Sequence, residues 1–222
     1  MTKIELITDR LINHLRQEIN RAHSIYILTS FAMKSGVDIL SDLLKQAAER
    51  GADIKICTGD YLFITQPEAL SALMEIHNGV EVRLWQSNGT SFHPKAYIFQ
   101  YDKSGTLIVG SSNLSRSALT SGVEWNLSMD KDIGPEAYDL AVKLFLEDIF
   151  HSDQTLPVNE ETIKNYRNHY IEYHQKHNNL VKIWTELEEV ELMLPVDYQQ
   201  NSKVEVAKDE SVPYGDIQPR FA

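Results

Sequence analysis

The sequence predicts an α/β protein with a mixed, largely parallel β-sheet flanked by helices, followed by a C-terminal helical extension. Three short apolar runs, Ser24–Phe31, Asp53–Thr58 and Val80–Trp85, are predicted to be buried strands. They alternate with segments whose apolar residues recur at helical spacing, and a β-α-β-α-β order is typical of a sheet covered by helices. Beyond Asn159 the chain is richer in charged residues, His and Tyr, which marks the extension.

The first helix is predicted within residues 8–22, where Thr8 or Asp9 is suited to cap its N-terminus. Its apolar positions recur at helical spacing: Leu11, Ile12, Leu15, Ile19 and Ala22. A second helix is predicted over Val37–Arg50, where Gly51 follows as a C-terminal signal. A capping box at Thr65–Glu68, with Pro in the first turn, opens a third helix.

Three further strands and a helix are predicted downstream. Lys95–Tyr101 and Thr106–Val109 are strand-like runs, and the linker Asp102–Gly105 between them suits a hairpin turn. Residues 123–129 are predicted as another strand, and Pro135–Phe150 as a helix with one apolar face.

The change in composition divides the chain into three parts. Residues 1–152 are predicted as one α/β domain, residues 153–194 as helices that pack on it or on a partner, and residues 195–222 as a linker or tail. Cys57 and Trp125 are expected in the core. The three histidines of the second part are expected on a solvated helix face, because two imidazoles at helical spacing make a poor metal site: His169, His174 and His177.

Charge and composition narrow the function classes. The net charge is −11, which argues against broad nonspecific binding to DNA or anionic membrane, although a local basic rim from Lys34, Arg83, Lys95 and Arg116 is compatible with it. A single cysteine permits no internal disulfide, and charges run through the first 30 residues, so no secretory leader is expected. No apolar stretch approaches the roughly 18 residues of a membrane span. A cytoplasmic protein without a membrane anchor is therefore expected.

Chemistry-bearing residues concentrate between Phe92 and Asn126. His93 and Lys95 stand two apart at the head of a strand-like run, so both side chains can point to the same face. An imidazole beside a fixed positive charge suits chemistry on an anion, and phosphate is the expected one. The next strand ends in Gly110-Ser111-Ser112-Asn113, and Glu124 lies 14 residues after Gly110.

These residues resemble the HxK…GSxN (HKD) signature of the phospholipase D-like superfamily, in its nuclease-like branch. The stretches TGDYLFITQPEAL, FHPKAYIF and GVEWNL are similar to the PLD-like domain at the N-terminus of bacterial DEAD/DEAH-type helicase-nuclease proteins and in some restriction endonucleases. The family's aspartate, five residues after the lysine, is Gln100 here. That aspartate is structural in the family, so its absence leaves the chemistry in place and favours the nuclease-like branch over a phospholipase.

The resemblance implies roles for five residues. His93 would attack phosphorus and form a phosphohistidine, while a second histidine would protonate the leaving oxygen and then activate water. Lys95, Ser111 and Asn113 would hold the phosphate oxygens, and Glu124 would orient a histidine. The resemblance implies that no metal or cofactor is needed.

Only the His-x-Lys at His93 is followed by GSxN, since His174-Gln175-Lys176 has the spacing without GSxN beyond it and the other six histidines lack a lysine two residues on. The two-histidine chemistry therefore predicts a homodimer whose two-fold axis passes near His93.

The sequence thus predicts a metal-independent phosphodiesterase, a nuclease acting on DNA, within a helicase-nuclease or restriction-type protein. Two alternatives stay open. One is a catalytically weak dimerisation or nucleic-acid docking module of a helicase. The other is a lipid phosphodiesterase, which no basic amphipathic segment supports.

Overall fold

The computed structural model describes the backbone of residues 3–187 and the side chains of residues 3–177. Its strands are β1 Ile4–Ile7, β2 Ser24–Thr29, β3 Asp53–Gly59, β4 Val80–Trp85, β5 Lys95–Gln100, β6 Gly105–Gly110, β7 Asn126–Asp130 and β8 Thr155–Pro157. Its α-helices are α1 Leu11–Arg21, α2 Lys34–Glu49, α3 Pro67–Met74, α4 Arg116–Thr120, α5 Pro135–Lys143 and α6 Glu160–Leu187.

The described strands form one mixed sheet in the order β1-β7-β6-β5-β2-β3-β4-β8. The α/β class is confirmed, but the expectation of a largely parallel sheet is wrong. Only β2–β3 and β3–β4 are parallel, and the other five pairings are antiparallel. Parallel neighbours need a long crossover, and α2 and α3 provide one for β2, β3 and β4 alone; β5 and β6 form the expected hairpin.

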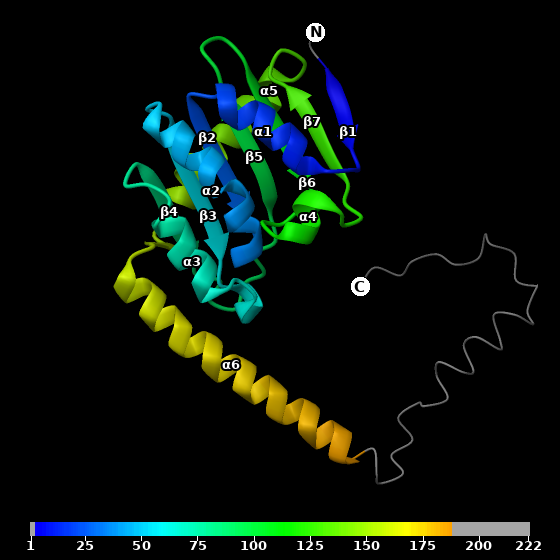
Figure 1. The fold of residues 1–222 in the computed structure, drawn as a ribbon, viewed down its shortest axis with the longest axis vertical. Helices are drawn as coiled ribbons and strands as arrows, with labels where there is room; N and C mark the ends of the chain where they lie inside the picture. The colour runs from blue at the N-terminus through cyan, green and yellow to red at the C-terminus, as the bar shows by residue number, and fades with distance from the viewer. Residues whose placement is uncertain (1–2, 188–222) are drawn as a thin grey trace, which may run out of the picture. The chain divides into compact units, whose positions relative to one another are not determined.

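One face of the sheet is covered by α1, α2 and α3, and α1 and α2 stand in front of the central strands in Figure 1. The apolar faces that the helical spacing predicts are those that the helices bury. Leu15 and Ile19 of α1 and Leu40 and Leu44 of α2 are fully buried against β2, β3 and β5. This burial holds the central strands in register and so fixes where their ends lie.

The opposite face is covered by α5 and by a π-helical segment, Leu144–Phe150, that continues it. Tyr138 and Phe145 pack there on β2 and β6, and the Tyr138 hydroxyl donates to the Phe99 carbonyl at 2.7 Å. Cys57 is fully buried in this layer, as expected, and burial raises the pKa of its thiol to about 12. The thiol is therefore a packing group.

Two predicted helix caps are wrong. The N-cap of α1 is Arg10, in a left-handed conformation with φ 43°, because β1 runs to Ile7 and the chain turns sharply before the helix. The capping box at Thr65 does not form. The Thr65 hydroxyl is buried and donates to the Gly59 carbonyl at 2.7 Å, so it ties the loop to β3, and α3 begins with Gln66 as N-cap.

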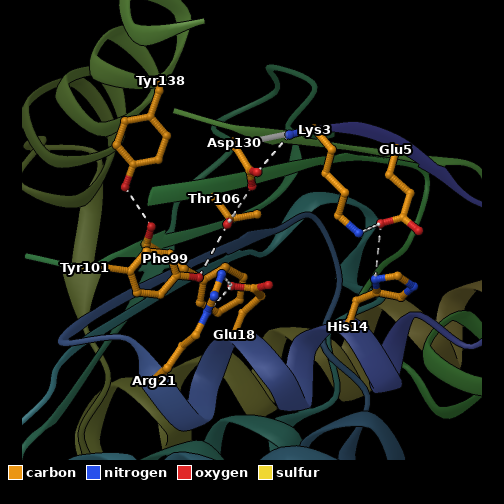
Figure 2. A network of polar contacts seen from close by, with 10 residues as sticks. All are labelled: Lys3, Glu5, His14, Glu18, Arg21, Phe99, Tyr101, Thr106, Asp130 and Tyr138. Carbon is orange, nitrogen blue, oxygen red and sulfur yellow. Dashed lines mark hydrogen bonds and ion pairs between the residues drawn. The ribbon is translucent and has the colours of Figure 1, made fainter. Parts of the chain in front are cut away.

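Strand β1 was not predicted; it is an edge strand that pairs with β7 across more than 100 residues of chain. Figure 2 shows the polar network beside it: Asp130 of β7 accepts from the backbone N–H of Lys3 at 2.9 Å, and Glu5 contacts both Lys3 and His14. These contacts tie β1 to β7 and to α1. Strand β8, which has three residues, forms the opposite edge of the sheet beside β4 and was also not expected.

The extension is one continuous helix, α6, among the described residues. The compact unit that carries the sheet runs through His174. Within it, Ile163 and Tyr166 of α6 pack on Leu70 and Leu84. The expected end of the extension (188–194) and the linker or tail (195–222) lie outside the described residues. No helix in residues 3–187 has both the length and the apolar character needed to cross a membrane.

Candidate active site

The sheet brings the motif residues to one of its ends. Strand β5 begins at Lys95, where the antiparallel strand β2 ends at Thr29. Strand β6 ends at Gly110, beside Asn126, where β7 begins. Antiparallel neighbours place the start of one strand beside the end of the next. The residues around 93–95, 111–113 and 124 therefore meet, although more than 30 positions of sequence separate the first from the last.

His93 and Lys95 lie together, as their spacing predicts. The Lys95 ammonium is 2.7 Å from Nδ1 and 3.1 Å from Nε2 of His93, and it also donates to the His93 carbonyl at 3.1 Å. The imidazole is exposed and contacts the Phe31 ring edge-on, with centroids 5.5 Å apart. Lys95 is only 6% exposed, and this desolvation lowers the pKa of its amine, against the opposing effect of the Glu124 carboxylate.

Ser111 and Glu124 form a second pair. The Ser111 hydroxyl donates to the Glu124 carboxylate and accepts from the Trp125 N–H at 2.9 Å. Among the described contacts Glu124 hydrogen-bonds Ser111 and does not reach His93. The carboxylate thus positions the serine of its own chain, while its charge acts on Lys95.

Asn113 is held by its oxygen. Its Oδ1 accepts from the Phe31 N–H at 3.3 Å and from the Thr29 hydroxyl at 3.4 Å. Its Nδ2 donates to no group among the described residues. An amide fixed in this way presents two N–H donors at the same sheet end as Lys95.

The support beneath the site includes residues that the sequence did not single out. Asn126 Nδ2 donates to the buried Ser112 hydroxyl at 2.9 Å, and Tyr97 donates to the Ser112 carbonyl at 3.1 Å. A Cβ at Gly110 would lie 2.3 Å from the Trp125 carbonyl oxygen, so only glycine fits. The only signal for Asn126 in the sequence is that an asparagine stands where a strand begins. Nothing in the neighbouring residues indicates that its side chain is buried.

Other expectations are resolved by position. Gln100 is at the far end of β5 from Lys95, about 16 Å away at the rise of a strand. Trp125 is 64% exposed, so its expected place in the core is wrong; β7 begins one residue later. Lys34 pairs with Asp38, and Arg83 lies over the Phe150 ring, so each of these two expected rim cations already has a partner. Within the described part of the chain, no three His, Cys, Asp or Glu side chains form a metal-ligand cluster.

The arrangement of strands, the position of the motif and the two helical layers define a phospholipase D-like α/β domain. Residues 15–149, which are more than half of the chain, match the family described as cardiolipin synthase, PLD-like domain. The chain belongs to this PLD-like domain family. None of the curated proteins matches the sequence at a significant level.

Solved structures agree on the fold. Nuc from Salmonella typhimurium, a phospholipase D family member, is 20% identical, with a TM-score of 0.55 over 71% of this chain and 98% of that one. Phosphatidylserine synthase from Haemophilus influenzae is 17% identical, with a TM-score of 0.52 over 82% of this chain and 47% of that one. NucT from Helicobacter pylori is 17% identical, with a TM-score of 0.45 over 79% and 97%. At these identities, the likeness to Nuc and to the phosphatidylserine synthase concerns the fold alone.

Proposed function

We propose that the protein is a metal-independent phosphodiesterase that cleaves nucleic acid, with DNA as the expected substrate, through a phosphohistidine in a site shared by two copies of the chain. The observation that carries this proposal is the buried Lys95 ammonium, 2.7 Å from an exposed His93 imidazole, with Asn113 and Ser111 at the same sheet end. A nucleophile beside fixed hydrogen-bond donors suits chemistry on a phosphodiester.

The reaction proceeds in two displacements. His93 of one copy attacks phosphorus, an N–P bond forms, and the P–O bond to the leaving strand breaks as the partner's His93 gives that oxygen a proton. The partner's His93 then takes a proton from water, the water oxygen attacks phosphorus, and the N–P bond breaks. The protons given and taken by the partner's imidazole balance over the cycle.

The remaining residues stabilise the phosphate. Lys95 and the free amide donors of Asn113 face the charge that develops on the non-bridging oxygens. Ser111 is a positioned hydroxyl, because the Trp125 N–H and the Glu124 carboxylate fix its direction. In this proposal Glu124 positions Ser111 within its own copy, and its orienting action on a histidine is directed to the partner's His93.

A row of exposed apolar side chains supports the pairing of two copies. Leu6 of β1, Leu127 of β7 and Val109 of β6 are direct cross-strand neighbours, and they are 52%, 48% and 47% exposed. Trp125, next to Glu124, extends the row at the end of the sheet that carries the site. Contiguous apolar surface of this kind marks an interaction site. It begins beside the candidate active site, which needs the histidine of a second copy.

The first experiment is cleavage of labelled DNA in excess EDTA by the wild type and by His93→Ala. His23→Ala is the matched control, because His23 is exposed and precedes β2 at the opposite end of the strand. EDTA-resistant cleavage that His93→Ala alone removes supports the proposal. DNA binding without cleavage by the wild type favours the docking module instead, and cleavage of a phospholipid diester without DNA cleavage overturns the nucleic-acid substrate.

The shared site is tested by mixing. When wild type and His93→Ala chains are exchanged at equal amounts, random pairing leaves about a quarter of the dimers intact, so activity falls to about 25% rather than about 50%. Activity that falls only to about 50%, as expected when the wild type is merely diluted, contradicts a site shared between copies.

The sequence resemblance also leads us to a proposal for the protein context of this domain, a helicase-nuclease or restriction-type protein. We propose this context from the matching stretches around residues 58–70 and 92–127. Detection of a motor domain encoded in frame with this one, and stimulation of its ATPase by the same DNA that His93 cleaves, tests the association.

A further inference from the structure

A large hollow lies next to the candidate active site and plays no part in the chemistry described above. Its volume is about 860 Å³. The loops that follow β3 (residues 60–63) and β4 (residues 86–89) form one side, and residues 159–173, mostly the first turns of α6, form the other. All of these residues belong to the compact unit that ends at His174. These loops lie at the same end of the sheet as His93, since the loop after β4 continues along the chain to His93.

Aromatic rings form one wall of this hollow. The Phe63 ring stacks on Tyr166 with centroids 5.9 Å apart and an interplanar angle of 23°, and it lies 5.2 Å from the Tyr173 ring. Tyr166 is fixed, because its hydroxyl donates to the Thr65 carbonyl at 2.7 Å, and burial raises its pKa. Tyr173 is 37% exposed. The wall is thus a rigid stack with an open ring at its edge, on which a planar ligand can stack.

The backbone holds this wall at some strain. Leu62, Phe63 and Asn88 have positive φ values of 55°, 50° and 47°, and the only other such non-glycine residue in the described part of the chain is Arg10. Left-handed conformations are costly for bulky side chains and persist where the surroundings fix them, often at ligand sites. Here the two loops that carry them face the same hollow.

Polar groups without partners complete the lining. Ser87 is 7% exposed, and its hydroxyl is the one buried side-chain polar atom of the described residues that has no hydrogen-bond partner. The side-chain amides of Gln86, Asn88 and Asn165 also line the hollow and make no hydrogen bond among the described residues. Amides are the side chains that pair with the donor and acceptor edges of bases.

The charge of the lining argues against a phosphate as the ligand. No lysine or arginine is among the described residues that line the hollow, whereas Asp60 and Glu161 are. Carboxylates repel a phosphate but not a neutral heterocycle. Aromatic stacking together with free amides and without lysine or arginine fits a nucleobase, whose phosphates remain outside.

The distance between the hollow and His93 also suits one substrate strand that contacts both. Gly89 lines the hollow and His93 is four residues further along, so their Cα atoms are at most about 14 Å apart. Between them Phe92 stacks on Trp85, with centroids 5.1 Å apart, and it packs against Gly59. This packed connection holds the hollow and the histidine at a fixed separation.

We propose that the hollow is a base-binding subsite that receives one unpaired nucleobase of the strand whose phosphodiester is cleaved at His93. The inference rests on the proposed function and specifies its substrate: a strand that is single or locally unpaired, because a base inside a duplex cannot stack on Phe63 and Tyr173. A subsite at this distance from the cleaved bond distinguishes unpaired from paired strands more than it distinguishes one base sequence from another.

The test uses the full chain, with a single-stranded oligonucleotide, the same strand in a duplex, and a series in which one abasic residue moves along the strand. The wild type is expected to prefer the single strand. One abasic position should raise KM by about tenfold, as the loss of one base–aromatic stack predicts. Tyr173→Ala should raise KM for the intact strand by a similar factor and should lose this sensitivity to the abasic position. Asn88→Gly, which keeps the positive φ and removes the amide, should shift KM in the same direction.

The matched control is Ile171→Ala, since Ile171 is 46% exposed on the same helix and does not line the hollow. Equal KM values for all abasic positions, or a Tyr173→Ala variant that keeps the wild-type profile, would overturn the subsite while cleavage at His93 stands. A peptide that competes with the oligonucleotide and loses binding in Tyr173→Ala, when the abasic series shows no effect, would also overturn it. Absence of His93-dependent cleavage on every strand overturns the proposed function itself.

Discussion

Replacement of Lys95 by Met separates what the ammonium does for catalysis from what it does for the fold. Lys95 is 6% exposed, and among the described residues the hydrogen bonds of its amine are to His93 alone. Met keeps the length and apolar volume of the stem and removes the charge. Loss of one donor that stabilises transition-state charge lowers kcat by about 10²–10³, or about 3–4 kcal/mol.

The free energy of unfolding of Lys95→Met is not expected to fall with the activity. Desolvation lowers the pKa of Lys95 below its usual 10.5, so the folded state binds this proton less tightly than the unfolded chain. Stability then rises with pH between the lowered pKa and 10.5, and the destabilising effect is fully present below that window. Lys95→Met removes this effect, so at pH 7 the variant should be no less stable than the wild type, and its stability should rise less as pH approaches 10.5.

Two measurements on one preparation test the predicted loss of rate and the predicted stability of Lys95→Met. Single-turnover cleavage in EDTA gives the loss of rate, and urea unfolding at pH 7 and pH 10 gives the free energy of unfolding. Lys95→Arg is the informative companion, because it keeps a charge but not the compact ammonium that lies against the imidazole. Activity of Lys95→Met within threefold of wild type, or a clear loss of stability at pH 7, would refute the reasoning.

Three more predictions follow from the geometry. Gly110→Ala should lower the free energy of unfolding by about 2–3 kcal/mol, since the new Cβ meets the Trp125 carbonyl at 2.3 Å; Gly51→Ala, with open space but φ 85°, should lose only about 1 kcal/mol in the same urea assay. Gln100→Asp should leave cleavage within about twofold, because position 100 lies about 16 Å along β5 from Lys95; a large gain would show that the family's aspartate acts on the site. Leu127→Lys, at a position 48% exposed between Leu6 and Val109, should give a monomer by light scattering and lose activity with little change in unfolding; a stable dimer would contradict the proposed surface.

Local patterns predicted most of the elements but not the edges of the sheet. The apolar spacing of α1 and α2, and the three runs that became β2, β3 and β4, are signals contained within a dozen residues. Strands β1 and β8 have four and three residues, and each depends on a partner far away in the chain. The cap predicted at Thr65 failed for a similar reason, because a tertiary hydrogen bond to Gly59 took its hydroxyl.

The site shows the same division. His93 and Lys95 are two residues apart, and the period of a strand alone predicts that they meet. The contacts of Ser111 with Glu124, and of Asn113 with Phe31, need the antiparallel register of β2, β5, β6 and β7. The exposure of Trp125 depends on where β7 begins and was therefore wrongly predicted.

The sequence by itself determined the α/β class, the helical faces and the chemical identity of the candidate site, because propensity, periodicity and short motif spacing act over a few neighbouring residues. Only the tertiary structure decided that the sheet is mostly antiparallel and that the loops at Phe63 and Asn88 meet α6 around a hollow. The physical reason is that strand pairing and helix docking join segments distant in the chain, and their free energy depends on shape and burial that no local pattern records.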